Sequence, residues 1–313
     1  MFPRERPVAL QLAAAITRYE QEVRPLPGIS DAAARGALIE QLIESLRRVR
    51  YVAVIQTRDI AEERADPNSA IFDPLRAGIL HSRADRFDEA CWLVFLSVHF
   101  GRHSRAGWRY VRDVYGRLGD TPLWDWDTVT SDVADFRRWL HEHQASLKRA
   151  GEARGFGNHR KYQSLDANSP TGTGAAVETY IEWVGPLRDH RLLFGDALVQ
   201  AEGDPRVVFD TLYGSMRMVA SFGRLARFDY LTMLGKLGLI GIEPGSTYME
   251  GATGPVAGAR LLCTGLEGSG VEPTTLDSWL VELESYLGVG MQVIEDALCN
   301  WQKSPMVFKP FRG

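Results

Sequence analysis

The sequence has few cysteines, no long apolar run and no excess of positive charge, and each of these absences excludes a class of protein. Its three cysteines lie far apart, so we expect neither a disulfide framework nor a CxxC-type zinc site. No segment approaches the ~18 uninterrupted apolar residues of a membrane span, and the first residues lack the apolar block of a signal peptide. We therefore expect a soluble cytoplasmic protein without a membrane partner.

The distribution of charge is more informative than its sum. A net charge of −4 at pH 7 argues against a protein that coats nucleic acid non-specifically, because such proteins are usually basic. Arginines are nevertheless concentrated in residues 102–117 and 217–236. Patches of this kind on an acidic protein are typical of one surface for an anionic ligand, although arginines on ordinary solvated helix faces give the same spacing.

The sequence motifs of several familiar enzyme classes are also missing. The chain has no GxxxxGK[ST] phosphate loop, no strand-borne GxGxxG and no HExxH, and it has no GxSxG. These absences argue against nucleoside-triphosphate hydrolysis, a Rossmann cofactor, a zincin and an α/β-hydrolase.

Apolar residues recur at three- and four-residue spacing over most of the chain, whereas strand-type alternation is scarce. Residues 31–54 are a clear example, with Leu38 and Leu42 on one face. Residues 88–100 are apolar nearly all round, which is typical of a helix at the centre of a bundle. The sequence therefore predicts an all-α fold of many helices in two packed lobes.

A segment rich in glycine, serine, proline and basic residues, 151–175, interrupts the helical pattern. Loops frequently carry functional residues, so we expect this one to contribute to a site. We place the lobe boundary here, with an N-terminal helical lobe over residues 1–165 and a C-terminal lobe over residues 166–313.

The first candidate motif is the arginine-rich segment 100–116. Guanidinium groups match phosphate oxygens in charge and geometry, and aromatic faces can stack on a base. A solvated helix is the alternative interpretation. The candidate residues for substrate or DNA contact are Arg102, His103, Arg105 and Trp108.

The second motif, 155–162, combines two glycines with a dense run of polar residues. Glycines allow the backbone to approach a ligand closely. His159 can accept a proton near neutral pH, and Arg160 and Lys161 can hold an oxyanion. A purely structural turn is the alternative. Asn158 and Tyr162 are the candidate binding residues of this motif.

The third motif is the glycine-rich segment 251–260. A helix, a glycine-rich hairpin and a second helix can present backbone amides to a DNA phosphate, as in helix-hairpin-helix glycosylases. A tight turn between helices needs no ligand and is the alternative. The candidate DNA-binding residues here and on the preceding helix are Arg224, Arg227, Asp229, Gly254 and Gly258.

The last predicted helix carries two candidate catalytic carboxylates, Glu295 and Asp296. A carboxylate here could activate an amine or orient Lys303, a candidate substrate-binding residue two turns beyond Glu295. A salt bridge or cap within the helix would also explain these residues. Three residues around the apolar helix are ambiguous in the same way: Asp88, Glu89 and His99.

Six sequence blocks, in order, resemble the α-glutamyl/putrescinyl thymine pyrophosphorylase family, the amino acid:DNA transferases of bacteriophage systems that hypermodify thymine. The blocks are FDPLRAG at Phe72, DEACWLVFLSVHFG at Asp88, FGNHRKYQSL at Phe156, FGRLARFDYLTML at Phe222, TGPVAGA at Thr253 and IEDALCNWQK at Ile294. The last three also resemble the helical domain of hydroxymethyluracil DNA kinases. This resemblance implies a C-terminal lobe similar to helix-hairpin-helix DNA glycosylases.

The resemblance implies a transferase that replaces the pyrophosphate of 5-pyrophosphoryloxymethyl-deoxyuridine in double-stranded DNA with an amine, after base flipping. The donor could be glycine, glutamate, another amino acid or putrescine. Mg²⁺ could accompany the pyrophosphate, although no ligand set stands out. If the protein is phage-encoded, it would act in the host cytoplasm.

Residue roles follow from the same resemblance. Stabilisation of the departing oxygens should be the largest catalytic effect. Cations suited to the leaving group are Arg102, Arg105, Arg160 and Lys161. Candidates for removing the amine proton are His159, Glu295 and Asp296, and candidates for stacking on the base are Trp108 and Tyr162. A glycosylase-like enzyme that excises a modified base and a non-catalytic DNA-binding helical module are the two alternative functions.

Overall fold

The computed structural model describes residues 5–149, 153–160 and 162–310. Within these ranges the chain forms fourteen α-helices and several short 3₁₀ helices, with no strand. An isolated antiparallel bridge joins His103 and Gly107. The predicted all-α fold is confirmed. No helix of the described ranges is long and apolar enough to cross a membrane.

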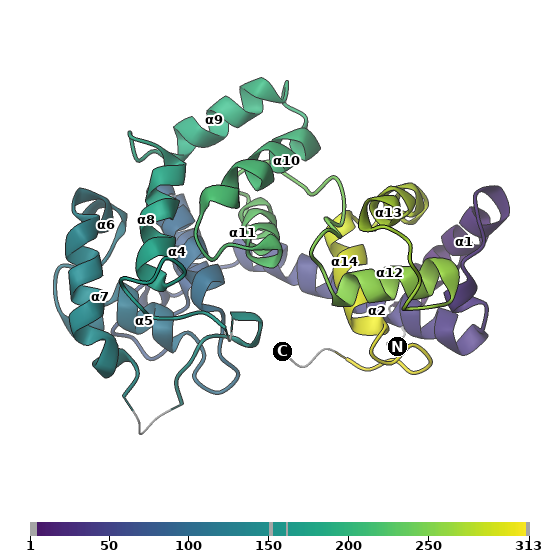
Figure 1. Ribbon diagram of the computed structural model, residues 1–313, viewed down its shortest axis with the longest axis horizontal. Helices are drawn as coiled ribbons and strands as arrows, with labels where there is room; N and C mark the ends of the chain where they lie inside the picture. Colours follow the sequence, from purple (N-terminus) through teal and green to yellow (C-terminus); the bar gives the residue numbers. More distant parts are fainter. Residues whose placement is uncertain (1–4, 150–152, 161, 311–313) are drawn as a thin grey trace. The chain divides into compact units, whose positions relative to one another are not determined.

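The chain forms two compact units that do not follow the order of the sequence (Figure 1). Unit 1 combines Met1–Ala53 with Glu243–Arg312, and unit 2 comprises Val54–Ile242. In Figure 1 the purple and yellow ends of the chain contribute to one unit, and the blue-to-green middle forms the other. The lobe boundary expected at residue 165 falls inside unit 2.

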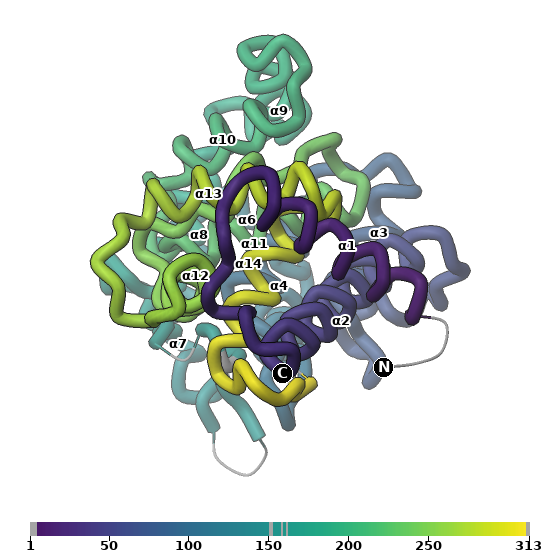
Figure 2. The backbone as a smooth tube through the Cα atoms, turned by 90° about the vertical axis from the view of Figure 1, so that its right-hand side faces the viewer, coloured from purple at the N-terminus to yellow at the C-terminus, as the bar shows by residue number. Residues whose placement is uncertain are grey.

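Unit 1 brings helices from both ends of the chain together. In it α1 packs on α13, and α12 packs on α14 (Figure 2). Proline in the first turn starts α13, and Gly288, with φ of +60°, ends it in the left-handed conformation that favours glycine. The α-helices of this unit are α1 (Arg6–Glu22), α2 (Ala32–Gln56, which continues past residue 53), α12 (Gly254–Thr264), α13 (Pro273–Leu287) and α14 (Met291–Trp301).

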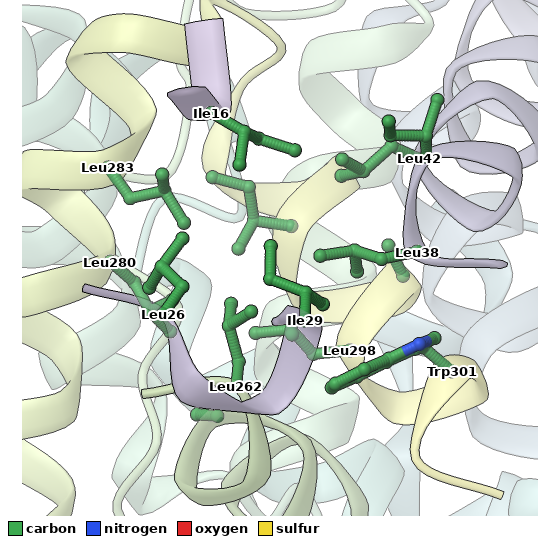
Figure 3. Close-up of a cluster of buried hydrophobic side chains, with 14 of the residues drawn as sticks. Ile16, Leu26, Ile29, Leu38, Leu42, Leu262, Leu280, Leu283, Leu298 and Trp301 are labelled. Carbon is green, nitrogen blue, oxygen red and sulfur yellow. The ribbon is translucent and has the colours of Figure 1, made fainter. Parts of the chain in front are cut away.

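The core of unit 1 is mainly aliphatic. Figure 3 shows leucine and isoleucine side chains from α1, α2, α12, α13 and α14 pointing toward one another. Burial of each such side chain stabilises the fold by roughly 1.5–3 kcal/mol. The labelled residues are Ile16, Leu26, Ile29, Leu38, Leu42, Leu262, Leu280, Leu283, Leu298 and Trp301. The short 3₁₀ helix η2 (Pro27–Ile29) packs on α12.

Unit 2 is organised around α4 (Phe87–Phe100), in which every residue from Glu89 to Phe100 is buried. It packs on α3, α5, α6, α9 and α11, as its apolar surface predicts. The other α-helices of this unit are α3 (Pro74–Arg83), α5 (Arg109–Tyr115), α6 (Trp126–Ser131), α7 (Val133–Leu147), α8 (Thr173–Val184), α9 (His190–Gln200), α10 (Pro205–Ser215) and α11 (Arg224–Lys236). Its 3₁₀ helices are η3 (Glu62–Arg64), η4 (Arg117–Gly119), η5 (Asn158–Arg160) and η6 (Met216–Met218).

Aspartate caps fix several helix starts in unit 2. The side chain of Asp73 accepts hydrogen bonds from the backbone amides of Leu75 and Arg76, each at 3.1 Å. Asp189 caps α9 and Asp204 caps α10 in the same way. Such a cap satisfies amides that have no partner inside the helix and typically stabilises it by ~1 kcal/mol.

Candidate functional site

The two basic motifs of unit 2 are brought together by a close approach of two glycines. The amide of Gly157 donates a hydrogen bond of 2.7 Å to the carbonyl of Phe100, at the end of α4. A Cβ on Gly157 would lie 2.8 Å from the carbonyl carbon of Gly101, and Gly101 itself has φ of +66°. Only glycine fits this geometry without strain. The second motif therefore docks directly on the start of the first.

Arg160 is the buried centre of this contact, with only 7% of its surface exposed. Its Nε donates to the carbonyl of Val98 at 2.7 Å, and its Nη2 donates to Asp229 Oδ2 at 2.6 Å. Two residues that the sequence singled out separately, Arg160 and Asp229, thus form an ion pair between η5 and α11. The Asp229 side chain is 38% exposed, but the guanidinium is buried and its hydrogen bonds join three segments of unit 2, so Arg160 has a clear structural role.

A second cluster of arginines surrounds the buried carboxylate of Asp113. Arg154 Nη1 lies 2.7 Å from Asp113 Oδ2, and Arg112 Nη2 lies 3.0 Å from Oδ1. Arg109 Nε is 3.5 Å from Oδ2. Three guanidinium groups around one carboxylate leave an excess of positive charge in a partly desolvated region, where it attracts anions more strongly than in bulk water.

Arg154 was not singled out from the sequence. It lies in the loop that was expected to be functional, but its partner Asp113 is 41 positions away in the chain. Its Nε is buried and makes no hydrogen bond to the described residues. The composition of the loop was the only available signal, because spacing does not reveal which carboxylate an arginine meets.

The exposed arginines of the first motif, Arg102 and Arg105, lie on a tight turn. The turn is closed by two backbone hydrogen bonds of 3.0 and 2.9 Å between His103 and Gly107. His103 Nδ1 accepts hydrogen bonds from the amides of Arg105 and Ala106, so the neutral ring carries its proton on Nε2. Within the described residues, Arg102 and Arg105 make no side-chain hydrogen bond or ion pair, which suits contact with an anionic ligand.

The remaining candidates of the second motif are only partly described. His159 is exposed, and 90% of Tyr162 is exposed. Asn158 begins η5, but its side chain is not described, and Lys161 lies outside the described residues. Trp108 is half-buried and immediately precedes α5.

The arginines of α11 contact aromatic rings of their own unit. The guanidinium of Arg227 lies 4.2 Å from the ring centre of Tyr213 and donates to the Tyr213 carbonyl at 2.9 Å. Burial lowers the pKa of Arg227. Arg224 lies 5.1 Å from the ring of Phe228. These contacts hold both arginines against the protein.

The candidate carboxylates of α14 lie in unit 1 and belong to a polar network there. Asp296 accepts hydrogen bonds from Ser45 Oγ at 2.5 Å and from the guanidinium of Arg48. Asn300 donates to Asp296 Oδ1 at 3.1 Å, and its own Oδ1 accepts from Lys303 Nζ at 3.2 Å. Glu295, the neighbour of Asp296, is buried with 8% exposure. The candidate residues therefore fall into two groups, one in each unit.

The glycines of the third motif lie where α12 packs on α14. A Cβ on Gly258 would lie 2.4 Å from the carbonyl oxygen of Leu298, and one on Gly254 would lie 2.9 Å from Cys299 Sγ. Small residues are needed here for helix packing alone. Contact with a DNA phosphate stays a prediction for both glycines.

A buried chain of titratable groups crosses the core of unit 2. Asp88 Oδ1 accepts from His190 Nδ1 at 2.6 Å, and His190 Nε2 lies 2.7 Å from the hydroxyl of Tyr180. That hydroxyl lies 2.8 Å from the hydroxyl of Tyr230. The chain joins α4, α9, α8 and α11, and Tyr230 is the neighbour of Asp229. From the sequence, Asp88 was the only one of these four residues considered as a candidate. The four residues are far apart along the polypeptide, so spacing does not show that they meet.

The charge states along this chain follow from burial and hydrogen bonding. Burial lowers the pKa of His190 although Asp88 opposes the shift, so His190 is neutral at pH 7. Burial opposes ionisation of Asp88, but hydrogen bonds from His190 hold the pKa of Asp88 below its usual value. Tyr230 can therefore donate to Tyr180, Tyr180 to His190, and His190 to the Asp88 carboxylate. Every hydroxyl and ring nitrogen in the chain has a partner.

Two further titratable groups of α4 are strongly perturbed. Burial raises the pKa of Glu89 to about 7, although hydrogen bonds from Tyr115 and the Trp126 amide act against the shift. Burial and the nearby Arg160 guanidinium lower the pKa of His99 to about 3. His99 Nε2 lies 2.9 Å from Thr173 Oγ1, which in turn donates to a backbone carbonyl. A histidine that is neutral at all physiological pH values is poorly suited to act as a base.

Fold and site together define an all-helical protein with an arginine-rich region suited to an anionic ligand. The described part of the chain holds no group of three or more His, Cys, Asp or Glu side chains that could bind a metal ion. The family model of the alpha-glutamyl/putrescinyl thymine pyrophosphorylases, clade 3, matches residues 33–313, and the chain belongs to this family. No curated protein and no solved structure matches it. The resemblance to this family is confirmed, and the family is one of enzymes that act in thymine modification. The resemblance of the C-terminal lobe to helix-hairpin-helix glycosylases stays a prediction.

Proposed function

We propose that the protein is a DNA base-modifying transferase, which displaces pyrophosphate from 5-pyrophosphoryloxymethyl-deoxyuridine in double-stranded DNA with an amine. The amine nitrogen forms a bond to the exocyclic methylene carbon while the bond from that carbon to the pyrophosphate oxygen breaks. The electron pair of the broken bond leaves with pyrophosphate, and the nitrogen loses a proton to a base. The donor is an amino acid or a polyamine.

The observation that carries the proposal is the arginine-rich region formed by the docking of the second motif on the first. A departing pyrophosphate accumulates negative charge, and positioned cations stabilise it most when they are already in place and partly desolvated. Asp113 holds Arg109, Arg112 and Arg154 in such a position. Arg102 and Arg105 are exposed beside them in the sequence and suit the DNA backbone or the pyrophosphate.

The other roles follow the same chemistry. His159 is exposed, and its imidazole can take the proton of the attacking amine. Tyr162, with its exposed ring, and Trp108 suit stacking on a base that has left the duplex. Glu295 and Asp296, which belong to unit 1, stay predictions from the sequence. Mg²⁺ would act through pyrophosphate oxygens.

The test is a product assay on DNA that contains the pyrophosphorylated base. The protein is incubated with this DNA and with glycine, glutamate or putrescine, and the digested nucleosides are identified by mass spectrometry. We expect an amine-bearing thymidine and released pyrophosphate. A parallel reaction with EDTA measures the requirement for a divalent metal. Free base would identify a glycosylase, and bound but unchanged DNA would identify a binding module; both results contradict the proposal.

The variants are chosen from the exposure of the arginines. Arg160→Ala would disturb folding, because Arg160 is buried and ion-paired with Asp229. The double substitution Arg102→Ala, Arg105→Ala removes exposed side chains and should lower the rate by about 100-fold. Arg138→Ala removes an exposed arginine of α7 as the matched control and should leave the rate unchanged. Equal activity of the double variant and the control would contradict the assignment of the arginines.

A further inference from the structure

Unit 1 contains a cavity of about 480 Å³ that the proposed transferase does not use. It lies between α1, α2, the end of α13 and the turn that follows α13. Its volume is within the range of cavities that hold small molecules. Much of its wall is apolar, and contributing side chains are Val8, Leu12, Leu46, Leu287 and Val289.

The charge of the cavity has one sign. Arg18 of α1 and Arg50 of α2 line it, and none of the described residues that line it is acidic. The guanidinium of Arg18 lies 5.2 Å from the ring centre of Tyr286, which also lines the cavity. The Tyr286 hydroxyl donates to Glu22 at 2.9 Å, so the ring is held in place.

Within the described residues, neither Arg18 nor Arg50 makes an ion pair. Other arginines of the same unit do: the partners are Arg24 with Glu282, Arg35 with Glu20, Arg47 with Glu5 and Arg48 with Asp296. Two guanidinium groups that line one partly apolar cavity therefore lack the carboxylate partner that these four arginines have. Guanidinium groups bind carboxylates more strongly than neutral groups, because the hydrogen bonds are charge-assisted.

We propose that this cavity binds a small organic carboxylate, with its head group at Arg18 and Arg50 and its carbon chain on the apolar wall. A cationic ligand would meet two positive charges and, among the described lining residues, no acidic side chain. A bare phosphate or a DNA backbone would contact the arginines but leave the apolar wall in water, so it gains less than an anion with a carbon chain. The site is independent of the proposed transferase reaction.

The test compares three probes of one length that differ in the head group: hexanoate, hexanol and hexylamine. Binding to the full chain, without DNA, is followed by nuclear magnetic resonance through the backbone amide of Gly288, which lines the cavity. We expect hexanoate to shift this signal with saturation, and to bind at least about tenfold more tightly than hexanol or hexylamine. Equal affinity for hexanol, or no shift with hexanoate, would overturn the proposal.

Substitutions assign the head-group contact. Arg18→Gln and Arg50→Gln should each weaken hexanoate binding by about tenfold, since each removes a charged donor. Arg6→Gln is the matched control, because Arg6 is an exposed arginine of α1 that does not line the cavity. All three side chains are exposed, so the melting temperatures should remain equal. Unchanged affinity in both cavity variants would contradict the proposal.

Competition with hexanoate tests whether the cavity binds another anion, either inorganic phosphate or the DNA backbone. Inorganic phosphate should displace hexanoate only weakly, because it leaves the apolar wall uncovered. A DNA duplex that displaced hexanoate and shifted Gly288 more strongly would show that these arginines bind the DNA backbone, and would overturn the assignment to a small carboxylate. Neither result depends on whether the transferase assay succeeds, since no reaction is measured.

Discussion

The interiors of the two units differ in kind. The core of unit 1 is built mainly from leucine and isoleucine, and its polar network around Asp296 lies toward the surface, where the carboxylate is 35% exposed. Unit 2 has an aromatic core, in which the ring centres of Phe95 and Tyr180 are 3.8 Å apart. Through that core runs the hydrogen-bonded chain that ends at Asp88 and Tyr230.

This difference indicates a division of roles. Aliphatic side chains contribute burial that does not depend strongly on direction, so unit 1 gains stability from shape and volume. Buried polar groups stabilise a fold only when each has a correctly placed partner. Unit 2 therefore depends on exact positions of its helices, including α11, whose Asp229 holds Arg160. Fixed helix positions also hold the guanidinium groups of Arg109, Arg112 and Arg154 in place around Asp113.

The largest effect on stability is expected in unit 1, where Gly258 allows α12 to pack closely on α14. Gly258→Ala places a Cβ 2.4 Å from a backbone oxygen, and should destabilise unit 1 by about 3 kcal/mol or more, measured by urea unfolding. Gly36→Ala is the control: nothing lies within 4 Å of its Cβ, and it should stabilise α2 by roughly 0.5–1 kcal/mol. Normal stability with weaker DNA binding in Gly258→Ala would instead support a phosphate contact.

Glu89 allows the titratable interior of unit 2 to be tested by pH. Its pKa is 4.5 in the unfolded chain and about 7 in the fold, so the unfolded state releases its proton first as pH rises. Stability is therefore lost between pH 4.5 and 7, by up to about 3 kcal/mol, and the loss is complete above pH 7. Glu89→Gln cannot ionise. The variant should gain stability relative to the unsubstituted protein as pH rises from 5 to 8, as measured by urea unfolding.

The difference between the two unfolding curves isolates Glu89 from other groups. His81 and His99 have pKa values lowered by burial to about 4 and about 3, so they reduce stability as pH falls below 6.5 in both proteins. A difference that stays constant from pH 5 to 8 would show that Glu89 ionises normally in the fold.

The smallest effect is expected when one tyrosine hydroxyl is removed from the core of each unit, and the two losses of stability are compared. Tyr180→Phe removes the hydroxyl that links His190 to Tyr230, and should destabilise unit 2 by about 2 kcal/mol because two buried polar groups lose a partner. Tyr19→Phe in unit 1 is the matched control. The Tyr19 hydroxyl makes only long hydrogen bonds of 3.4 and 3.5 Å, so its loss should cost less than about 1 kcal/mol. Equal losses would remove the distinction between the two interiors.

Much of the helical architecture was predictable from local pattern. The three- and four-residue spacing of apolar residues over 31–54 corresponds to α2, and the all-apolar segment 88–100 became the central helix α4. Family membership was also recognisable, since it rests on ordered sequence blocks that need no coordinates. The compact units were not predictable in this way, because α1 packs on α13 across almost the whole length of the chain.

The candidate site was predictable only in part. Composition identified the basic motifs and their loop, but spacing could not show that Arg160 would be buried against Asp229, or that Arg154 would join Arg109 and Arg112 at Asp113. Arginines in both places look alike in sequence. Whether an arginine stabilises the fold or remains available to a ligand depends on which carboxylate the fold brings to it.

The sequence by itself determined the helical class, the central apolar helix, the basic segments and the family, because each of these is recorded in neighbouring residues or in ordered blocks. Tertiary structure alone decided which residues meet. It joined Asp88, His190, Tyr180 and Tyr230 into one series of hydrogen bonds, and left Arg18 and Arg50 beside a partly apolar cavity. The physical reason is that burial and pairing depend on distances in space, whereas helix formation depends mainly on residues one turn apart.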